Sequence, residues 1–143
     1  MMVRQTGQQT GQEAGRTGIY LSPMAQRRGE FSEACASLFA RLHLADSTDV
    51  AASLVVREQP DLLVIDLDRF EPSIDLDALA DLVERRAGAP TLLLCPGPGA
   101  AWLPALMARG PVGYAVTPLV PAALHARVEA ALDHPAAGAP TSD

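Results

Sequence analysis

The chain has 143 residues, a formal net charge of −6 and a hydrophobic content of 48%, which fit one folded domain with a sizeable core. The negative charge argues against a nucleic-acid-binding surface, because such surfaces carry a basic stripe. No apolar run approaches the ~20 residues of a membrane-spanning helix, and the amino-terminal residues lack the apolar core of a signal peptide. We therefore expect a cytoplasmic protein whose partners are neither nucleic acids nor membranes.

The basic and sulfur-containing residues exclude further kinds of chemistry. All 11 basic residues are arginine, so the chain has no lysine for a Schiff base or for a P-loop. Cys35 and Cys95 form no C-x-x-C pair and have no histidine cluster nearby, which argues against a zinc site. We expect both to be reduced, buried thiols. His43, His125 and His134 show no ligand spacing and are expected at the surface.

Composition divides the chain into three regions. Residues 1–16 are polar and lack hydrophobic periodicity, which predicts a disordered leader. Residues 134–143 have the composition of a linker or tail, which indicates either a frayed end or a domain cut from a longer protein. The region between them, residues 17–133, carries the regular patterns of a folded domain.

The predicted elements alternate between strand and helix. In chain order, the first half gives a strand at Ile19–Leu21, a helix with apolar positions from Phe31 to Leu42, a strand at Leu42–Asp46, a helix from Val50 to Val55 and a strand at Leu62–Asp66. The second half gives a helix from Leu76 to Val83, a strand at Thr91–Cys95, a short helix from Trp102 to Met107, a strand at Tyr114–Val116 and a helix from Val120 to Leu132. The residues Asp46 to Asp49 are all cap candidates for the second helix, and Asp46 is expected to be its N-cap.

The alternation predicts the fold class. Strands that alternate with helices and have apolar centres imply a parallel sheet covered on both faces. About five such units in roughly 120 residues match an α/β, flavodoxin-like, doubly wound sheet with strand order 2-1-3-4-5. The run Pro60–Asp66 is the most informative stretch, because four large aliphatic residues in a row end on a carboxylate. Ligands collect at the carboxyl ends of parallel strands, so Asp66 is expected where function usually lies.

Three blocks of the sequence resemble the CheY-like receiver domain of bacterial response regulators. Pro60–Asp66 is similar to the family's third strand, which ends on the phosphoacceptor aspartate. Pro90–Cys95 lies at the position of the fourth strand, and Gly110–Pro118 has the form of the family's Gly-Ala-x-x-Tyr-x-x-Lys-Pro segment. The blocks have the order and spacing of a receiver, and the resemblance extends from about Gly18 to Leu132. It implies that Asp66 stands at the phosphoacceptor position.

The same resemblance shows altered residues at the functional positions. Receivers have an acidic pair after the first strand, where this chain has Ser22 and Pro23. They have serine or threonine where this chain has Cys95, and lysine where it has Thr117. Magnesium needs hard oxygen ligands, with carboxylates among them, and phosphoryl transfer needs cations that neutralise the developing charge. The altered positions therefore imply a degenerate receiver in which Asp66 is not needed as a phosphoacceptor.

The resemblance thus predicts a pseudo-receiver, which is not an enzyme and binds no cofactor. Such a domain would act in bacterial signal transduction as a protein-interaction or dimerisation module, attached to an output domain. In receivers, the fourth helix, fifth strand and fifth helix form the usual face for a partner or a second copy. Tyr114, Trp102 and Pro118 are the switch or interface candidates on this face. For Trp102, a core role is an equal alternative.

Two functions of other classes stay open. One is a working receiver that phosphorylates Asp66 slowly and holds magnesium with unusual ligands, for which Asp68 is a candidate. The other is a flavodoxin-like sensor that binds a small ligand at the strand ends near Asp66 and Gly97. Treatment with a phosphoryl donor distinguishes the first from a pseudo-receiver, and a ligand-dependent melting temperature identifies the second.

Overall fold

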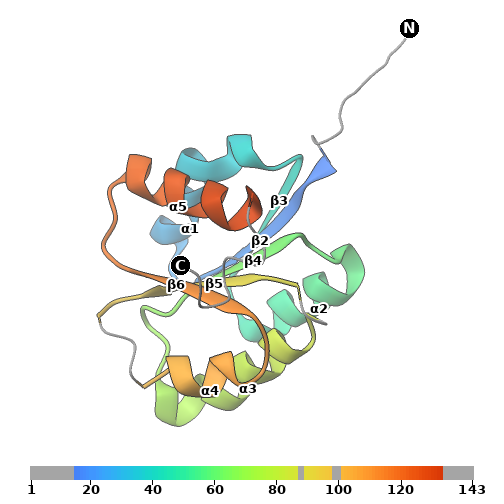
Figure 1. The fold of residues 1–143 in the computed structure, drawn as a ribbon, viewed down its shortest axis with the longest axis vertical. Coiled ribbons are helices and arrows are strands. Elements are labelled where there is room, and N and C mark those ends of the chain that lie inside the picture. Colours follow the sequence, from blue (N-terminus) through green and yellow to red (C-terminus); the bar gives the residue numbers. More distant parts are fainter. Residues whose placement is uncertain (1–14, 87–88, 98–100, 134–143) are drawn as a thin grey trace, which may run out of the picture.

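The computed structural model describes residues 15–86, 89–97 and 101–133 (Figure 1). Within these residues, parallel strands form one five-stranded sheet in the order β3-β2-β4-β5-β6, which confirms the predicted order. The strands are β2 (Thr17–Leu21), β3 (Arg41–Ala45), β4 (Leu62–Asp66), β5 (Thr91–Cys95) and β6 (Val112–Val116). No helix among the described residues has the length and apolar character needed to cross a membrane.

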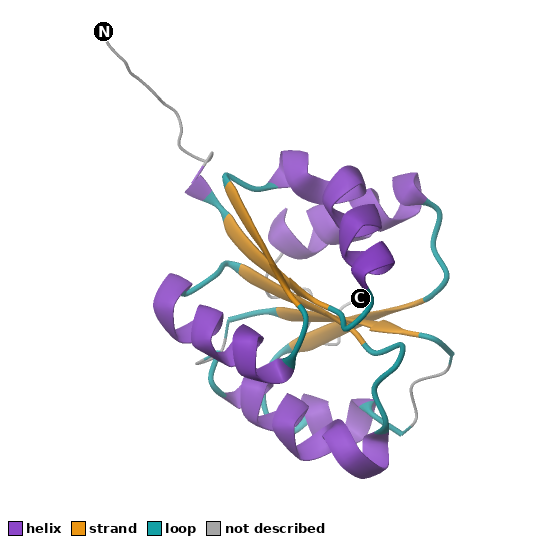
Figure 2. Ribbon diagram, turned by 180° about the vertical axis from the view of Figure 1, so that it is seen from behind, coloured by secondary structure: helices purple, strands orange, loops and turns teal. Residues whose placement is uncertain are grey.

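The helices lie on both faces of the sheet, as Figure 2 shows. They are α1 (Ala25–Cys35) with the 3₁₀ turn η3 (Ala36–Leu38), α2 (Thr48–Glu58), α3 (Pro72–Glu84), α4 (Leu103–Met107) and α5 (Pro121–Asp133). Helices α1 and α5 cover one face, and α2, α3 and α4 cover the other (Figure 1). The predicted doubly wound architecture is therefore confirmed.

Each face of the sheet has its own apolar core, because side chains alternate along a strand. In β2, Ile19 and Leu21 belong to the core beneath α2, α3 and α4, whereas Tyr20 belongs to the core beneath α1 and α5. Strands β4 and β5 are buried along their whole length, since they lie in the middle of the sheet between two helical layers. This explains why both appear in the sequence as unbroken apolar runs.

The first predicted helix is too long. Helix α1 ends at Cys35, and Leu42 lies in β3 rather than on the helix. The backbone N–H groups of Ala40 and Arg41 both donate to the carbonyl oxygen of Arg16, at 2.8 and 3.2 Å, so pairing with the first strand replaces helical hydrogen bonds there. Apolar residues after α1 continued the helical spacing because they still face the same core.

Two further expectations fail or hold only in part. The N-cap of α2 is Ser47, not Asp46, and the Ser47 hydroxyl accepts the N–H of Val50 at 3.2 Å. Either residue type can cap a helix, so sequence alone did not separate these neighbours. The surface position expected of His43 holds only in part, since its side chain is 27% exposed and its Nε2 lies 3.5 Å from Glu58 Oε1.

The predicted leader and tail fall mostly outside the described residues. Of the leader, residues 1–14 lie outside, whereas Arg16 forms an ion pair with Asp133 of α5 at 3.1 Å. The tail at residues 134–143, which includes His134, lies outside as well. An ion pair therefore joins the residue before the first strand to the last helix of the described domain.

Candidate functional site

Asp66 is the last residue of β4 and lies at the carboxyl edge of the sheet. Its side chain is only 2% exposed, although it is ionisable. It lines a cavity of about 120 Å³, together with Tyr20, Phe31, Thr117 and other side chains of the α1 and α5 face. A carboxylate at this depth requires hydrogen-bond donors or a counter-charge.

The structure supplies donors to both oxygens of Asp66. The Tyr20 hydroxyl donates to Oδ2 at 2.8 Å, and Arg27 Nη1 donates to the same oxygen at 3.0 Å. The backbone N–H of Asp68 donates to Oδ1 at 3.1 Å. Neither oxygen of the carboxylate is therefore left without a protein donor.

Arg27 joins two carboxylates with one guanidinium group. Its Nη2 donates to Asp68 Oδ2 at 2.7 Å, while its Nη1 binds Asp66. Burial alone would lower the pKa of Arg27, but the charges of Asp66 and Asp68 outweigh burial, and the pKa is raised. The guanidinium therefore stays charged and offsets the negative charges of Asp66 and Asp68. Asp66 and Asp68, which the sequence suggested as candidate ligands for a cation, instead bind the guanidinium of Arg27.

Tyr20 is held rigidly as a donor to Asp66. Its ring stacks on Phe31 of α1, with centroids 4.1 Å apart and an angle of 13° between the planes. Burial, followed by the charge of Asp66, raises the pKa of Tyr20 far above its usual range. The phenol therefore keeps its proton, and the stacked ring fixes the direction in which that proton is donated.

Ser22 and Pro23 follow β2, where receivers carry their acidic pair. The Ser22 side chain is fully buried, and its hydroxyl accepts the N–H of Met24 at 3.1 Å. Its carbonyl oxygen accepts from Arg28 Nη1 at 2.8 Å. These contacts shape the loop into α1 and add no negative charge beside Asp66.

Cys95 and Thr117 occupy the other two altered positions. Cys95 is fully buried in the core beneath α2, α3 and α4, and burial, with a smaller effect of Asp66, raises the pKa of its thiol. Cys35 is buried as well, and burial raises its pKa to about 11. Thr117 lines the Asp66 cavity, and its N–H donates to the carbonyl oxygen of Cys95 at 2.8 Å. Both cysteines are thus the buried thiols that the sequence predicts.

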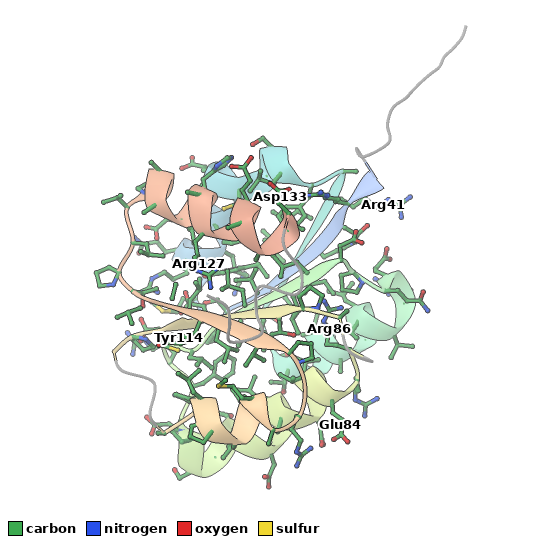
Figure 3. The ribbon with its side chains drawn as sticks, in the orientation of Figure 1. Arg41, Glu84, Arg86, Tyr114, Arg127 and Asp133 are labelled. Atoms are coloured by element: carbon green, nitrogen blue, oxygen red, sulfur yellow. The ribbon has the colours of Figure 1, made fainter. Side chains whose placement is uncertain are left out.

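The structure separates the three switch or interface candidates. Tyr114 lies on β6 (Figure 3) with 47% of its surface exposed, and it does not line the Asp66 cavity. Trp102 is only 6% exposed and packs in the core beneath α2, α3 and α4, which favours its core role over an interface role. Pro118 lines the Asp66 cavity. These residues therefore do not form one continuous switch.

Sequence reasoning missed Tyr20 and Arg27, the two side chains that bind Asp66. A signal for Tyr20 existed, because a parallel pairing of the first and third strands puts it on the same face as Val64 and Asp66. For Arg27 the signal is electrostatic, since a buried carboxylate in a chain without lysine must find an arginine. Among the described residues, no group of three or more histidine, cysteine, aspartate or glutamate side chains could hold a metal ion.

No family model matches this sequence, and no curated protein matches it. Among solved structures, chemotaxis protein CheY4 of Vibrio cholerae is similar, with a TM-score of 0.69 and 14% identity over 81% of this chain and 98% of that chain. A response regulator from Thermotoga maritima has a TM-score of 0.68 and 18% identity, over 83% of this chain and 98% of that chain. A Burkholderia pseudomallei protein with a suggested role in pilus assembly has a TM-score of 0.65 and 20% identity, over 94% of this chain and 98% of that chain.

These similarities agree with the topology described above. One of the three structures is a chemotaxis protein and another is a response regulator, and this chain covers almost the whole of each. Their sequence identities are low, so the likeness concerns the arrangement of strands and helices. The chain has the CheY-like fold of a response-regulator receiver domain.

Proposed function

We propose that the chain is a pseudo-receiver in bacterial signal transduction, which acts through protein interaction or dimerisation and does not need phosphorylation of Asp66. It would bind no cofactor, catalyse no reaction and regulate an attached output domain. The receiver fold supports the signalling role. The observation that carries the proposal is the hydrogen bonding of Asp66, whose two oxygens already have three protein donors.

These donors oppose phosphoryl transfer because they occupy the oxygens that would have to attack phosphorus. To attack phosphorus, one oxygen of Asp66 must first lose its bond to Arg27 or Tyr20. A hydrogen bond to a charged group contributes about 1.5–3 kcal/mol, so losing one slows the reaction by roughly tenfold to a hundredfold. The resident guanidinium also repels a magnesium ion, and Ser22 and Pro23 offer no carboxylate to hold one. Both effects act on the same reaction and in the same direction.

A surface for a partner is present on β6 and its neighbours. Tyr114 and Val116 on β6 are 47% and 49% exposed, and Val120 before α5 and Met107 on α4 are 67% and 47% exposed. Among the described strands, β6 also lies at an edge of the sheet, where it pairs with β5 alone. Exposed apolar side chains beside an open strand edge are typical of interaction sites. This supports a partner or a second copy on the α4, β6 and α5 face.

Phosphorylation is tested directly by incubating the protein with acetyl phosphate and magnesium, and separately with beryllofluoride, followed by intact-protein mass spectrometry. We expect no phosphoryl adduct and no beryllofluoride-dependent change in melting temperature. An adduct that disappears in Asp66→Asn would instead establish the working receiver. A melting temperature raised by a member of a nucleotide and metal panel would establish the small-ligand sensor.

The interaction role is tested by sedimentation velocity over a dilution series. We expect a dimer that dissociates on dilution, and a weaker dimer in Tyr114→Glu, because the new charge must be desolvated in the interface. Val56→Glu on α2 is the matched control, since Val56 is 64% exposed and α2 lies outside the α4, β6 and α5 face. Dimers that weaken equally in both variants would contradict the β6 face.

A further inference from the structure

A second site lies at the opposite end of the sheet from Asp66. A surface cleft of about 430 Å³ is formed where α2 ends and where β4 and β5 begin. Its lining includes Val55, Val56, Pro60, Arg85, Arg86 and Ala89. Figure 3 shows Arg86 beside the end of α2. None of these residues takes part in the Asp66 site.

Arg86 is a buried arginine whose guanidinium binds backbone carbonyl groups instead of a carboxylate. Its side chain is 5% exposed, and its two terminal nitrogens donate to carbonyl oxygens, Nη1 to Pro60 at 2.8 Å and Nη2 to Pro90 at 2.6 Å. Its Nε has no partner among the described residues, and no carboxylate there forms an ion pair with it. Arginine is rarely buried without a paired charge, because burial removes its hydration.

The negative charge of Asp61 acts on Arg86 but does not compensate for the burial of its guanidinium. Burial lowers the pKa of Arg86 to about 10, and the charge of Asp61 only partly opposes that effect. Asp61 accepts the backbone N–H of Thr17 at 2.8 Å, so its carboxylate is already bound elsewhere. Arg86 is therefore still protonated at neutral pH, and its positive charge is held against neutral carbonyl groups.

The rest of the cleft complements an anion that has an apolar part. Arg85 adds a second guanidinium at the rim, and the lining contains no acidic side chain. The walls are aliphatic, and Val56 leaves 64% of its surface open to solvent. Two arginines beside aliphatic walls fit an oxyanion carried by an apolar body, because one part satisfies the charge and the other covers the walls.

We propose that this cleft is a binding site for an oxyanion, phosphate or carboxylate, attached to an apolar body. Arg86 supplies a fixed positive charge that no carboxylate among the described residues pairs with, and Arg85 supplies the donors at the rim. A purely structural clamp would need only the two bonds from Arg86 to Pro60 and Pro90, and it would give no reason for a second arginine or an acid-free lining. The site is independent of the proposed pseudo-receiver function.

The test uses phenyl phosphate as the probe, with inorganic phosphate and benzoate as separate arms. In two-dimensional NMR of the full chain, phenyl phosphate should shift the Nε–Hε signal of Arg86 and the methyl signals of Val56. The signal of Arg57 should stay in place, because Arg57 is paired with Glu58 and does not line the cleft. A larger shift with benzoate than with phenyl phosphate would identify a carboxylate rather than a phosphate as the preferred group.

Two variants make the result decisive. Arg85→Gln should raise the dissociation constant of phenyl phosphate about tenfold, whereas the matched control Arg57→Gln should leave it unchanged. Because Arg85 is exposed, its replacement leaves the fold intact. No shift at Arg86, or equal affinity in the wild type and Arg85→Gln, would overturn the site. Equal affinity for inorganic phosphate and phenyl phosphate would overturn the apolar half of the proposal.

Discussion

The two ends of the sheet hold a buried charge in different ways. At the carboxyl end, Asp66 is 2% exposed and receives an arginine, a phenol and a backbone N–H. At the amino end, Arg86 is 5% exposed and binds only neutral carbonyl groups. A charge that meets an opposite charge within the chain needs nothing further. A buried charge that contacts only neutral dipoles is not neutralised and can still bind an external counter-ion. In this respect the Arg86 site differs from the Asp66 site, where the counter-charge belongs to the chain.

Arg86→Met should cause the largest loss of stability, because it removes the Arg86 donor from the carbonyl oxygen of Pro60 and leaves that of Pro90 with only the longer bond from the Leu63 N–H, at 3.4 Å. We expect the free energy of unfolding to fall by about 3 kcal/mol in urea denaturation. Arg85→Met is the control, because Arg85 is exposed, and it should change the value by less than about 0.5 kcal/mol. Equal losses in the two variants would contradict the role of Arg86.

Arg27→Met should lower the free energy of unfolding by about 2 kcal/mol, which is less than the loss in Arg86→Met. The loss is smaller because Asp66 keeps Tyr20 and the Asp68 N–H as donors. The second variant, Arg27→Met with Asp66→Asn, removes the carboxylate that would be left without its cation. We expect this double variant to regain about 1 kcal/mol relative to Arg27→Met alone, measured by a double-mutant cycle in urea. Strict additivity of the two substitutions would mean that the ion pair contributes nothing.

Tyr20→Phe should cost about 1 kcal/mol at neutral pH, because one bond to Asp66 is lost while the ring stack on Phe31 remains. Its pH dependence is more informative. The pKa of Tyr20 is raised in the folded state, so the unfolded chain releases this proton first, near pH ~10. The stabilising effect of Tyr20 is therefore present below about pH 10 and is lost as the pH rises above it, by up to about 1.4 kcal/mol per pH unit.

Alkaline unfolding curves should show this slope in the wild type and a smaller slope in Tyr20→Phe. Tyr114→Phe is the matched control, because Tyr114 is 47% exposed and makes no side-chain hydrogen bond among the described residues. It should keep the slope of the wild type. Identical slopes in all three proteins would show that the buried phenol is not linked to folding.

Glycine substitutions should give the smallest effects, and these should be stabilising. Gln59 after α2 and Arg69 after β4 have positive φ angles of 47° and 78°, one at each end of the sheet. Glycine adopts this conformation without strain, so Gln59→Gly and Arg69→Gly should each raise the free energy of unfolding by about 0.5 kcal/mol in urea denaturation. A loss of stability in Arg69→Gly alone would reveal an added role for the Arg69 side chain beside Asp66.

The bounds of the central strands could be predicted from the sequence more closely than those of the edge strand β6. Leu62–Asp66 and Thr91–Cys95 match β4 and β5 to the residue, because strands covered on both faces must be apolar throughout. The edge strand β6 begins at Val112, before its predicted start, and most of its residues are partly or fully exposed. Hydrophobic patterns follow burial, so they lose their definition where burial is partial.

The candidate site was predictable in place but not in composition. Asp66 could be found because the end of a buried parallel strand is a known position for function. Arg27 could not, because it reaches Asp66 across 39 positions of sequence, through a helix whose first residues carry no pattern that points inward. Arg86 was likewise hidden, since an arginine after a helix ordinarily lies in solvent. Both depend on tertiary packing, which local patterns do not encode.

The link between Arg27 and Asp66 has a consequence for what the domain can report. A magnesium ion or a phosphoryl group arrives and departs, so a site that uses them follows the supply of those species. Arg27 is part of the chain and remains beside Asp66 and Asp68 for as long as the fold persists. A pseudo-receiver built in this way would carry its counter-charge permanently, and its partners would respond to how much of the protein is present rather than to how recently it was modified.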